Sequence, residues 1–195
     1  MVGSLLFALN TSATNLHMKQ IVTLEEFRTY NNYMEDGTDE LCEIFIDSAS
    51  SIVSTYLGYD PNATEYSELS EGIGSEKLFT AVPHIEVFDS VRRVDNDEVL
   101  DDLTANEEYI YSKSNSKVFE SGVIYEVHYT GGWNIVPSDI KLAVLRISAL
   151  MLAESNGNIG ITSKSEYDQS RTFISYANYD KYLKPLVNYK SKRIC

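Results

Sequence analysis

The sequence has few cysteines and no long hydrophobic run. Only two of its 195 residues are cysteines, Cys42 and Cys195. Two cysteines so far apart exclude a disulfide-rich scaffold and a cysteine-based zinc site, because both need clustered cysteines. The longest apolar run near the start, residues 5–9, is too short to span a bilayer. No lysine or arginine precedes this run, so the segment does not resemble a signal peptide.

Basic residues are also scarce. Sixteen lysines and arginines against 29 acidic residues give a net charge of −13, which disfavours sequence-independent binding to nucleic-acid phosphates. Residues 60–102 hold twelve acidic and three basic residues, whereas residues 181–195 hold five basic and no acidic ones. This asymmetry favours docking of a basic tail on an acidic protein surface. A simpler explanation of the basic cluster is that its cations stabilise the end of a solvated helix.

Motifs for catalysis and for metal binding are missing. The acidic run 95–102 lacks the glycine and the glutamate at the sixth and twelfth positions of an EF-hand loop. The glycine-rich segment 71–77 fits neither a Walker loop nor a dinucleotide fingerprint. The three histidines are isolated, and Cys42 lies among the core positions of a predicted helix, which favours a buried, inert thiol. The sequence therefore predicts no enzyme, no cofactor and no metal site.

Hydrophobic periodicity predicts four helices. The first spans about 24–33 and begins with a capping box from Thr23 to Glu26. The second, 39–57, carries a continuous apolar stripe and stops at Gly58. Two more are predicted at about 138–155 and 176–189, and Pro185 must kink or restart the last one.

Strand patterns dominate residues 78–130. Val123–Thr130 is the clearest, because valines and tyrosines alternate with more polar residues. We therefore expect an α+β fold that is mainly α, in which a helical hairpin and two C-terminal helices form a helical bundle core. A small antiparallel β region, about 78–130, is inserted. Residues 18–189 would form a single domain, between an N-terminal extension at 1–17 and a basic C-terminal tail at 190–195.

Several segments resemble one protein family. The most specific is residues 127–133, a strand followed by Gly131, Gly132 and Trp133, with Pro137 and a helix directly after it. The start at 21–27, the helix end at 56–58 and the ending at 186–193 fit the same pattern. In this order, the segments resemble the bacteriophage head–tail connector (adaptor, or head-completion) proteins.

The resemblance implies a structural virion protein without catalytic residues. Members of this family form a dodecameric ring below the portal, extend the DNA channel and dock the next neck or tail component. The expected partners are the portal protein, the neck and tail proteins and other copies of the chain, with duplex DNA passing through unbound during ejection. The expected location is the neck of the virion after synthesis in the host cytoplasm, with no membrane involved.

Two sets of residues follow as interface candidates. The last helix and tail would contact the portal or a neighbouring subunit, and the loop 156–171 is a second candidate contact. The contact residues expected there are Tyr182, Leu183, Leu186, Tyr189, Lys190, Lys192 and Arg193. Twelve acidic chains would repel DNA from a channel. The candidates for lining it are Asp95, Asp97, Glu98, Asp101 and Asp102.

Two other classes of function stay open at this point. An acidic regulator that mimics DNA would place its carboxylates on an exposed face and bind a DNA-binding protein. A small hydrolase using a carboxylate pair would need a concave pocket and a raised carboxyl pKa, and no motif supports it.

Overall fold

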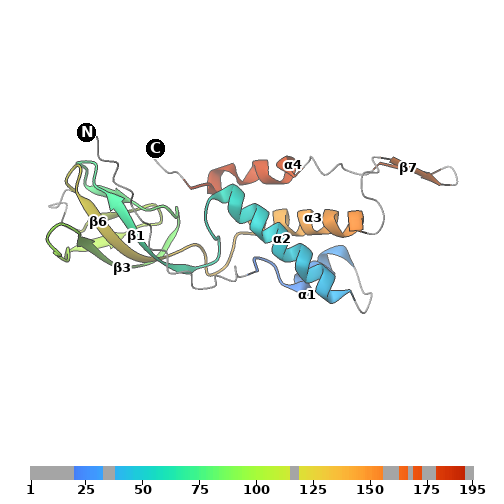
Figure 1. Ribbon diagram of the computed structural model, residues 1–195, viewed down its shortest axis with the longest axis horizontal. Helices are drawn as coiled ribbons and strands as arrows, with labels where there is room; N and C mark the ends of the chain where they lie inside the picture. The colour runs from blue at the N-terminus through green and yellow to red at the C-terminus, as the bar shows by residue number, and fades with distance from the viewer. Residues whose placement is uncertain are drawn as a thin grey trace, which may run out of the picture.

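The computed structural model describes residues 20–32, 38–114, 119–155, 163–166, 169–172 and 179–191. Figure 1 shows two parts side by side, a group of helices and a group of strands. We call residues 60–133, which hold the strands β1 to β6, the β lobe. The helices α1, α2, α3, α4 and η3 form the helical layer. The predicted extension at 1–17 lies outside the described residues.

The helical layer is built on two long helices. α2 spans Asp39–Leu57, the range expected from its apolar stripe, and ends at Gly58, whose φ is 87°. α3 spans Ser138–Ala153 and packs along α2. The shorter α1, Leu24–Asn31, begins with the predicted capping box: Glu26 N donates to Thr23 Oγ1, and Thr23 N donates to the Glu26 carboxylate. Because these helices are amphipathic, their buried faces meet in one core.

Two three-stranded antiparallel sheets make up the β lobe. The first has the order β1–β6–β3, with β1 at Thr64–Glu71, β3 at Ile85–Arg93 and β6 at Ile124–Gly131. The second has the order β2–β5–β4, with β2 at Lys77–Phe79, β4 at Leu103–Ala105 and β5 at Tyr109–Ser112. A separate hairpin pairs β7, Ser163–Glu166, with β8, Gln169–Thr172.

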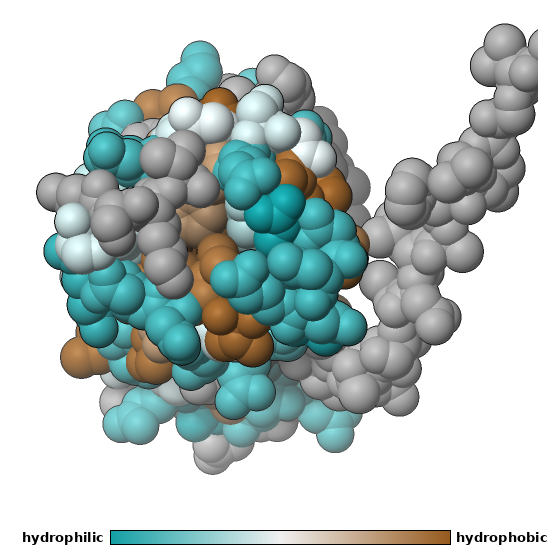
Figure 2. All heavy atoms as spheres, turned by 90° about the vertical axis from the view of Figure 1, so that its left-hand side faces the viewer, coloured by the Kyte–Doolittle hydropathy of each residue, from teal (hydrophilic) through white to brown (hydrophobic). Residues whose placement is uncertain are grey.

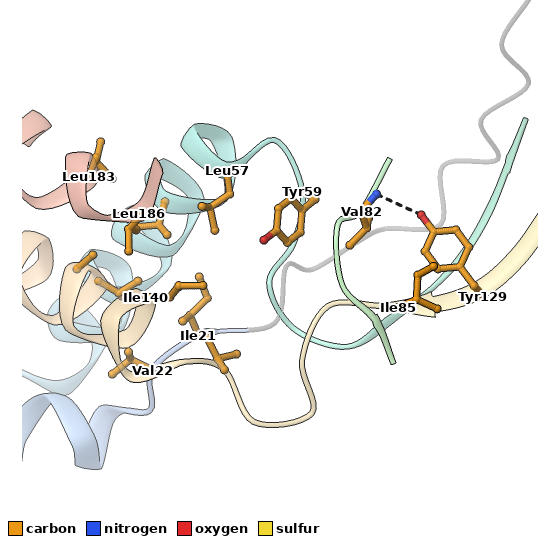
Figure 3. Packing of buried hydrophobic residues seen from close by; sticks show 14 of the residues in the cluster. Ile21, Val22, Leu57, Tyr59, Val82, Ile85, Tyr129, Ile140, Leu183 and Leu186 are labelled. Carbon is orange, nitrogen blue, oxygen red and sulfur yellow. Dashed lines mark hydrogen bonds between the residues drawn. The ribbon is translucent and has the colours of Figure 1, made fainter. Parts of the chain in front are cut away.

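The central strand β6 has the alternation expected from its sequence. Tyr125, Val127 and Tyr129 are buried, while Glu126 and His128 lie on the opposite face. The Tyr129 hydroxyl accepts a hydrogen bond from Val82 N at 3.3 Å, as Figure 3 shows. Burial raises the pKa of the Tyr129 phenol well above its ordinary value. The Tyr129 phenol therefore stays neutral and accepts a hydrogen bond inside the protein.

One hydrophobic cluster connects the two parts. Leu57, Ile140, Leu183 and Leu186 meet where α2, α3, α4 and η3 converge, and Tyr59 lies between them and the β lobe (Figure 3). The same cluster continues through the sheets. Because the core runs through both parts, the helical layer and the β lobe support each other.

The expectation of a mainly α fold with a helical bundle core was wrong. Three-stranded antiparallel sheets make the β lobe a principal part of an α+β fold. The strands also begin at Thr64, well before the expected start at residue 78. β1 has polar residues on both faces, and Tyr66 is the one large apolar residue that it turns toward the core. Its pairing with β6, and not its own hydrophobic pattern, makes it a strand.

Candidate assembly surfaces

The C-terminal segment is interrupted beside Pro185, which agrees with the prediction that this proline kinks or restarts the helix expected over 176–189. The described part begins at Tyr179 and forms a short α-helix, α4 at Asp180–Leu183, followed by a 3-10 helix, η3 at Lys184–Tyr189. Pro185 lies in the first turn of η3. Proline has no amide hydrogen to donate to the helical ladder, so the α-helix gives way to a tighter 3-10 segment here.

Two of the predicted contact residues belong to the core of this chain. Leu186 is completely buried and Leu183 is 7% exposed, both against the helical layer (Figure 3). Neither side chain is available to another protein, so their assignment as direct contacts is corrected: they anchor the segment. Tyr182, Tyr189 and Lys190 stay partly accessible. Lys192 and Arg193 lie outside the described residues.

An aromatic cluster lies where the C-terminal segment crosses between the two parts. The Trp133 ring centroid is 4.9 Å from that of His84, 6.0 Å from that of Tyr59 and 5.8 Å from that of Tyr189. The Tyr59 hydroxyl donates to the Tyr189 carbonyl at 2.7 Å. Each aromatic contact of this kind adds about 0.5–1.5 kcal/mol beyond burial. Sequence reasoning did not find this cluster, because its members are far apart in the chain.

The Gly131–Gly132 pair explains how Trp133 reaches this position. Gly132 has φ 92°, and a Cβ there would lie 2.5 Å from the Asn62 carbonyl oxygen. A Cβ on Gly131 would lie 2.9 Å from both Tyr129 and Val82. Side chains are therefore excluded at both positions, and the backbone can turn sharply from β6 toward α3. The glycine pair noted in the sequence is a structural requirement of this junction.

The last described residues are fixed to both parts. Ser191 N donates to the Leu57 carbonyl at 2.9 Å, and Ser191 Oγ donates to the Ala81 carbonyl at 2.6 Å. The Lys190 ammonium lies 4.0 Å from the centroid of the Tyr56 ring. Lys190 and Ser191, the described part of the basic tail, therefore have defined positions beside the aromatic cluster.

The five predicted channel-lining acids lie together in the connection between β3 and β4, and all are exposed. Arg93 Nε lies 2.7 Å from Asp95 Oδ1, and Arg92 Nη1 lies 2.8 Å from Asp97 Oδ1. The hydrogen bond from Arg93 lowers the pKa of Asp95. These two acids are thus partly neutralised within the chain, which the count of charges alone did not predict.

Most of the excess negative charge belongs to the β lobe. Residues 60–133 hold sixteen acidic and five basic residues, a net of −11 out of −13. Figure 2 views the molecule from this end and shows hydrophilic residues on both sides of a band of hydrophobic ones. The exposed apolar side chains of the β lobe include Leu69, Ile73 and Val99. The helices of the helical layer hold eight acidic and five basic residues, a net charge of −3.

The described residues contain no group of three or more histidine, cysteine or acidic side chains that could hold a metal ion. Cys42 is 1% exposed, and burial raises the pKa of its thiol, so it is a poor nucleophile. Among the described helices, none has the length and hydrophobicity needed to cross a membrane.

Comparison with known proteins gives the family. Residues 20–181 match the model of the head completion protein family. The chain belongs to the head completion protein family. This membership confirms the resemblance to bacteriophage head-completion proteins stated above. The match covers α1, α2, the entire β lobe, α3 and the first two residues of α4.

A curated relative and two solved structures agree with it. The head completion protein of Escherichia phage T5 is 27% identical over 165 residues, covering 78% of this chain and 82% of the relative. A chain from the neck of an empty gene transfer agent (GTA) particle, computed with C6 symmetry, has a TM-score of 0.51 at 10% identity. A chain from the virion of a native GTA particle has a TM-score of 0.50 at 10% identity. Each match covers 90% of this chain and 92% of the other chain, so the fold is shared.

Proposed function

We propose that this head completion protein is a structural component of the phage neck, where copies form a ring below the portal. The ring extends the DNA channel and docks the next neck or tail component. Family membership carries this proposal. The shared fold with a chain from a particle neck supports it, and a ring of twelve copies is compatible with the C6 symmetry used for that neck.

The acidic β lobe gives the channel a physical role. Carboxylates that face duplex DNA release no condensed counterions from it, so they supply no driving force for binding. Glu98 and Asp101 are exposed in the β3–β4 connection, beside the arginine-paired Asp95 and Asp97. We therefore place this connection on the channel side, where it lets DNA pass without adhering.

The C-terminal segment supplies the contact with the portal. Tyr189 and Lys190 are partly accessible, and Ser191, which precedes the rest of the basic tail, is fixed by its hydrogen bonds. A basic tail on an acidic partner surface gives an attraction that salt screens, because the Debye length falls to about 3 Å at 1 M ionic strength. Release of the protein by salt is the behaviour expected of this contact.

A phage carrying an amber mutation in this gene tests the proposal. Under non-suppressing conditions, electron microscopy should show heads without tails, and wild-type protein supplied in trans should restore complete particles. Normal tailed particles in the absence of the protein would overturn the proposal. No observation favours a role as an acidic regulator or as a hydrolase.

A further inference from the structure

The outer side of α3 contains a hollow with two cations at its rim. The hollow has a volume of about 500 Å³ and lies between α1, α3 and α4. Its apolar part consists of Ala149, Leu150 and Ala153, and the rings of Tyr30 and Tyr182 flank it. Arg146 and Lys181 complete the lining. The hollow thus combines apolar surface with positive charge.

Neither cation has a carboxylate partner among the residues that the structure describes. The Arg146 guanidinium lies 5.8 Å and the Lys181 ammonium 5.0 Å from the centroid of the Tyr182 ring. Neither forms an ion pair with the described residues, whereas Arg28, Arg92 and Arg93 do. Two neighbouring cations that pair with no acid of the described residues are available for a carboxylate of another molecule.

The outer side of α2 has the complementary character. Ile44 is 58% exposed, an unusual exposure for an isoleucine within a long helix. Glu40, Glu43 and Asp47 lie one helical turn or less from it and are exposed as well. Glu40 and Glu43 form no ion pair within the described part of the chain. The result is an exposed apolar surface of Ile44 and Leu41 with three carboxylates beside it.

These two surfaces face different sides of the helical layer. Ile44 lies opposite Ile46, Ala49 and Val53, the residues that α2 buries. Arg146 and Leu150 likewise point away from the buried face of α3. Ile44 lines a separate hollow between α2 and the C-terminal end of α3, with Met151 and Glu154, and this hollow shares no lining residue with the one beside Arg146. A single chain cannot bring the two surfaces together, but two neighbouring copies can.

We propose that Ile44 of one copy enters the α3 hollow of the next, with Glu40, Glu43 and Asp47 facing Arg146 and Lys181. Such a contact joins two different surfaces of identical chains, which generates a closed ring when the rotation between copies closes. A buried apolar anchor with charges at the rim is a typical arrangement for a binding hot spot. This inference rests on the ring proposed above. It assigns the interface between neighbouring subunits of that ring to α2 and α3.

Photo-crosslinking in assembled particles tests the contact directly. The full-length protein carries p-benzoylphenylalanine in place of Tyr30, which is 44% exposed at the hollow. After irradiation, mass spectrometry should identify a crosslink to the α2 peptide around Ile44. Mixed particles containing heavy-isotope and light copies should show that the crosslink joins two molecules. A crosslink to any other segment or protein, or none, overturns the interface.

Charge reversal supplies the second arm. Arg146→Glu should reduce the crosslink yield about tenfold or more, and adding Glu43→Lys should restore most of it. Lys113→Glu, the same charge change in the β lobe, should leave the yield unchanged. Equal crosslink yields for all three variants contradict the interface. If the copy number in particles nevertheless stays near twelve, the proposed ring is unaffected. Absence of multiple copies contradicts the ring itself.

Discussion

Gly132 is the position where the backbone geometry makes the sharpest prediction. Its φ of 92° lies in the left-handed region, and an added Cβ would lie 2.5 Å from the oxygen and 2.8 Å from the carbon of the Asn62 carbonyl. These are backbone atoms, held by hydrogen bonds from Ala63 N to the Trp133 carbonyl and from Trp133 N to the Pro61 carbonyl. They cannot move without disturbing the junction between the β lobe and α3.

Two separate costs add up in Gly132→Ala. The left-handed conformation costs a residue other than glycine about 1–2 kcal/mol. Forcing a methyl group into an occupied space costs about 1–3 kcal/mol more. We therefore expect the free energy of unfolding to fall by about 2–5 kcal/mol.

Gly122→Ala is the matched control. Gly122 also has a positive φ, 79°, but a Cβ there would meet nothing within 4 Å. The free energy of unfolding of this variant should fall by about 1–2 kcal/mol, because only the left-handed conformation is unfavourable for alanine there. Urea denaturation followed by tryptophan fluorescence measures both losses. If the two variants are destabilised equally, the close approach to Asn62 is not what requires glycine at position 132.

Three further predictions follow from the core, the helix cap and the tail. Leu186→Ala, at a completely buried position, should cost about 2–5 kcal/mol in thermal or urea unfolding, and a smaller loss would contradict its role as an anchor. The hydrogen bond from Lys141 lowers the pKa of Glu26 below its ordinary 4.5, so Glu26→Gln should cost about 0.5 kcal/mol at pH 7. That difference should disappear as the pH falls through the lowered pKa, because both side chains are then neutral; a constant difference down to pH 2 would refute the linkage. Removing residues 190–195 should abolish binding of the purified protein to portal rings in a pull-down at 0.1 M salt, and unchanged binding would exclude the tail as the contact.

Local signals in the sequence predicted part of the fold. The capping box of α1 and the apolar stripe of α2 depend on residues three or four positions apart. Both could therefore be predicted from the sequence, and both occur in the structure. β1 was missed, because its partner strand β6 supplies most of its stabilisation from about sixty residues away in the chain. The break beside Pro185 was predicted, but the sequence did not specify that a 3-10 helix follows it. The error in fold class follows from the missed strand, because the β part was expected to be a small insertion.

The candidate surfaces could likewise be predicted only in part. Charge and residue type pointed to the acidic connection and to the C-terminal segment, and the structure adds which side chains are accessible there. The burial of Leu183 and Leu186 depends on contacts with α2 and α3, which periodicity cannot identify. The pairing of Asp95 and Asp97 with Arg93 and Arg92 was likewise hidden in a count of charges. The channel-lining role of these acids and the portal contact stay predictions.

The copy number of the protein in purified particles tests the central claim most directly. Quantitative mass spectrometry with isotope-labelled reference peptides gives the ratio of this protein to the major capsid protein. If the protein forms a neck ring, we expect about twelve copies per particle. This number should stay the same after nuclease treatment and gradient purification, which remove loosely bound protein. Absence from particles, or a few copies that vary between preparations, would contradict a ring in the neck.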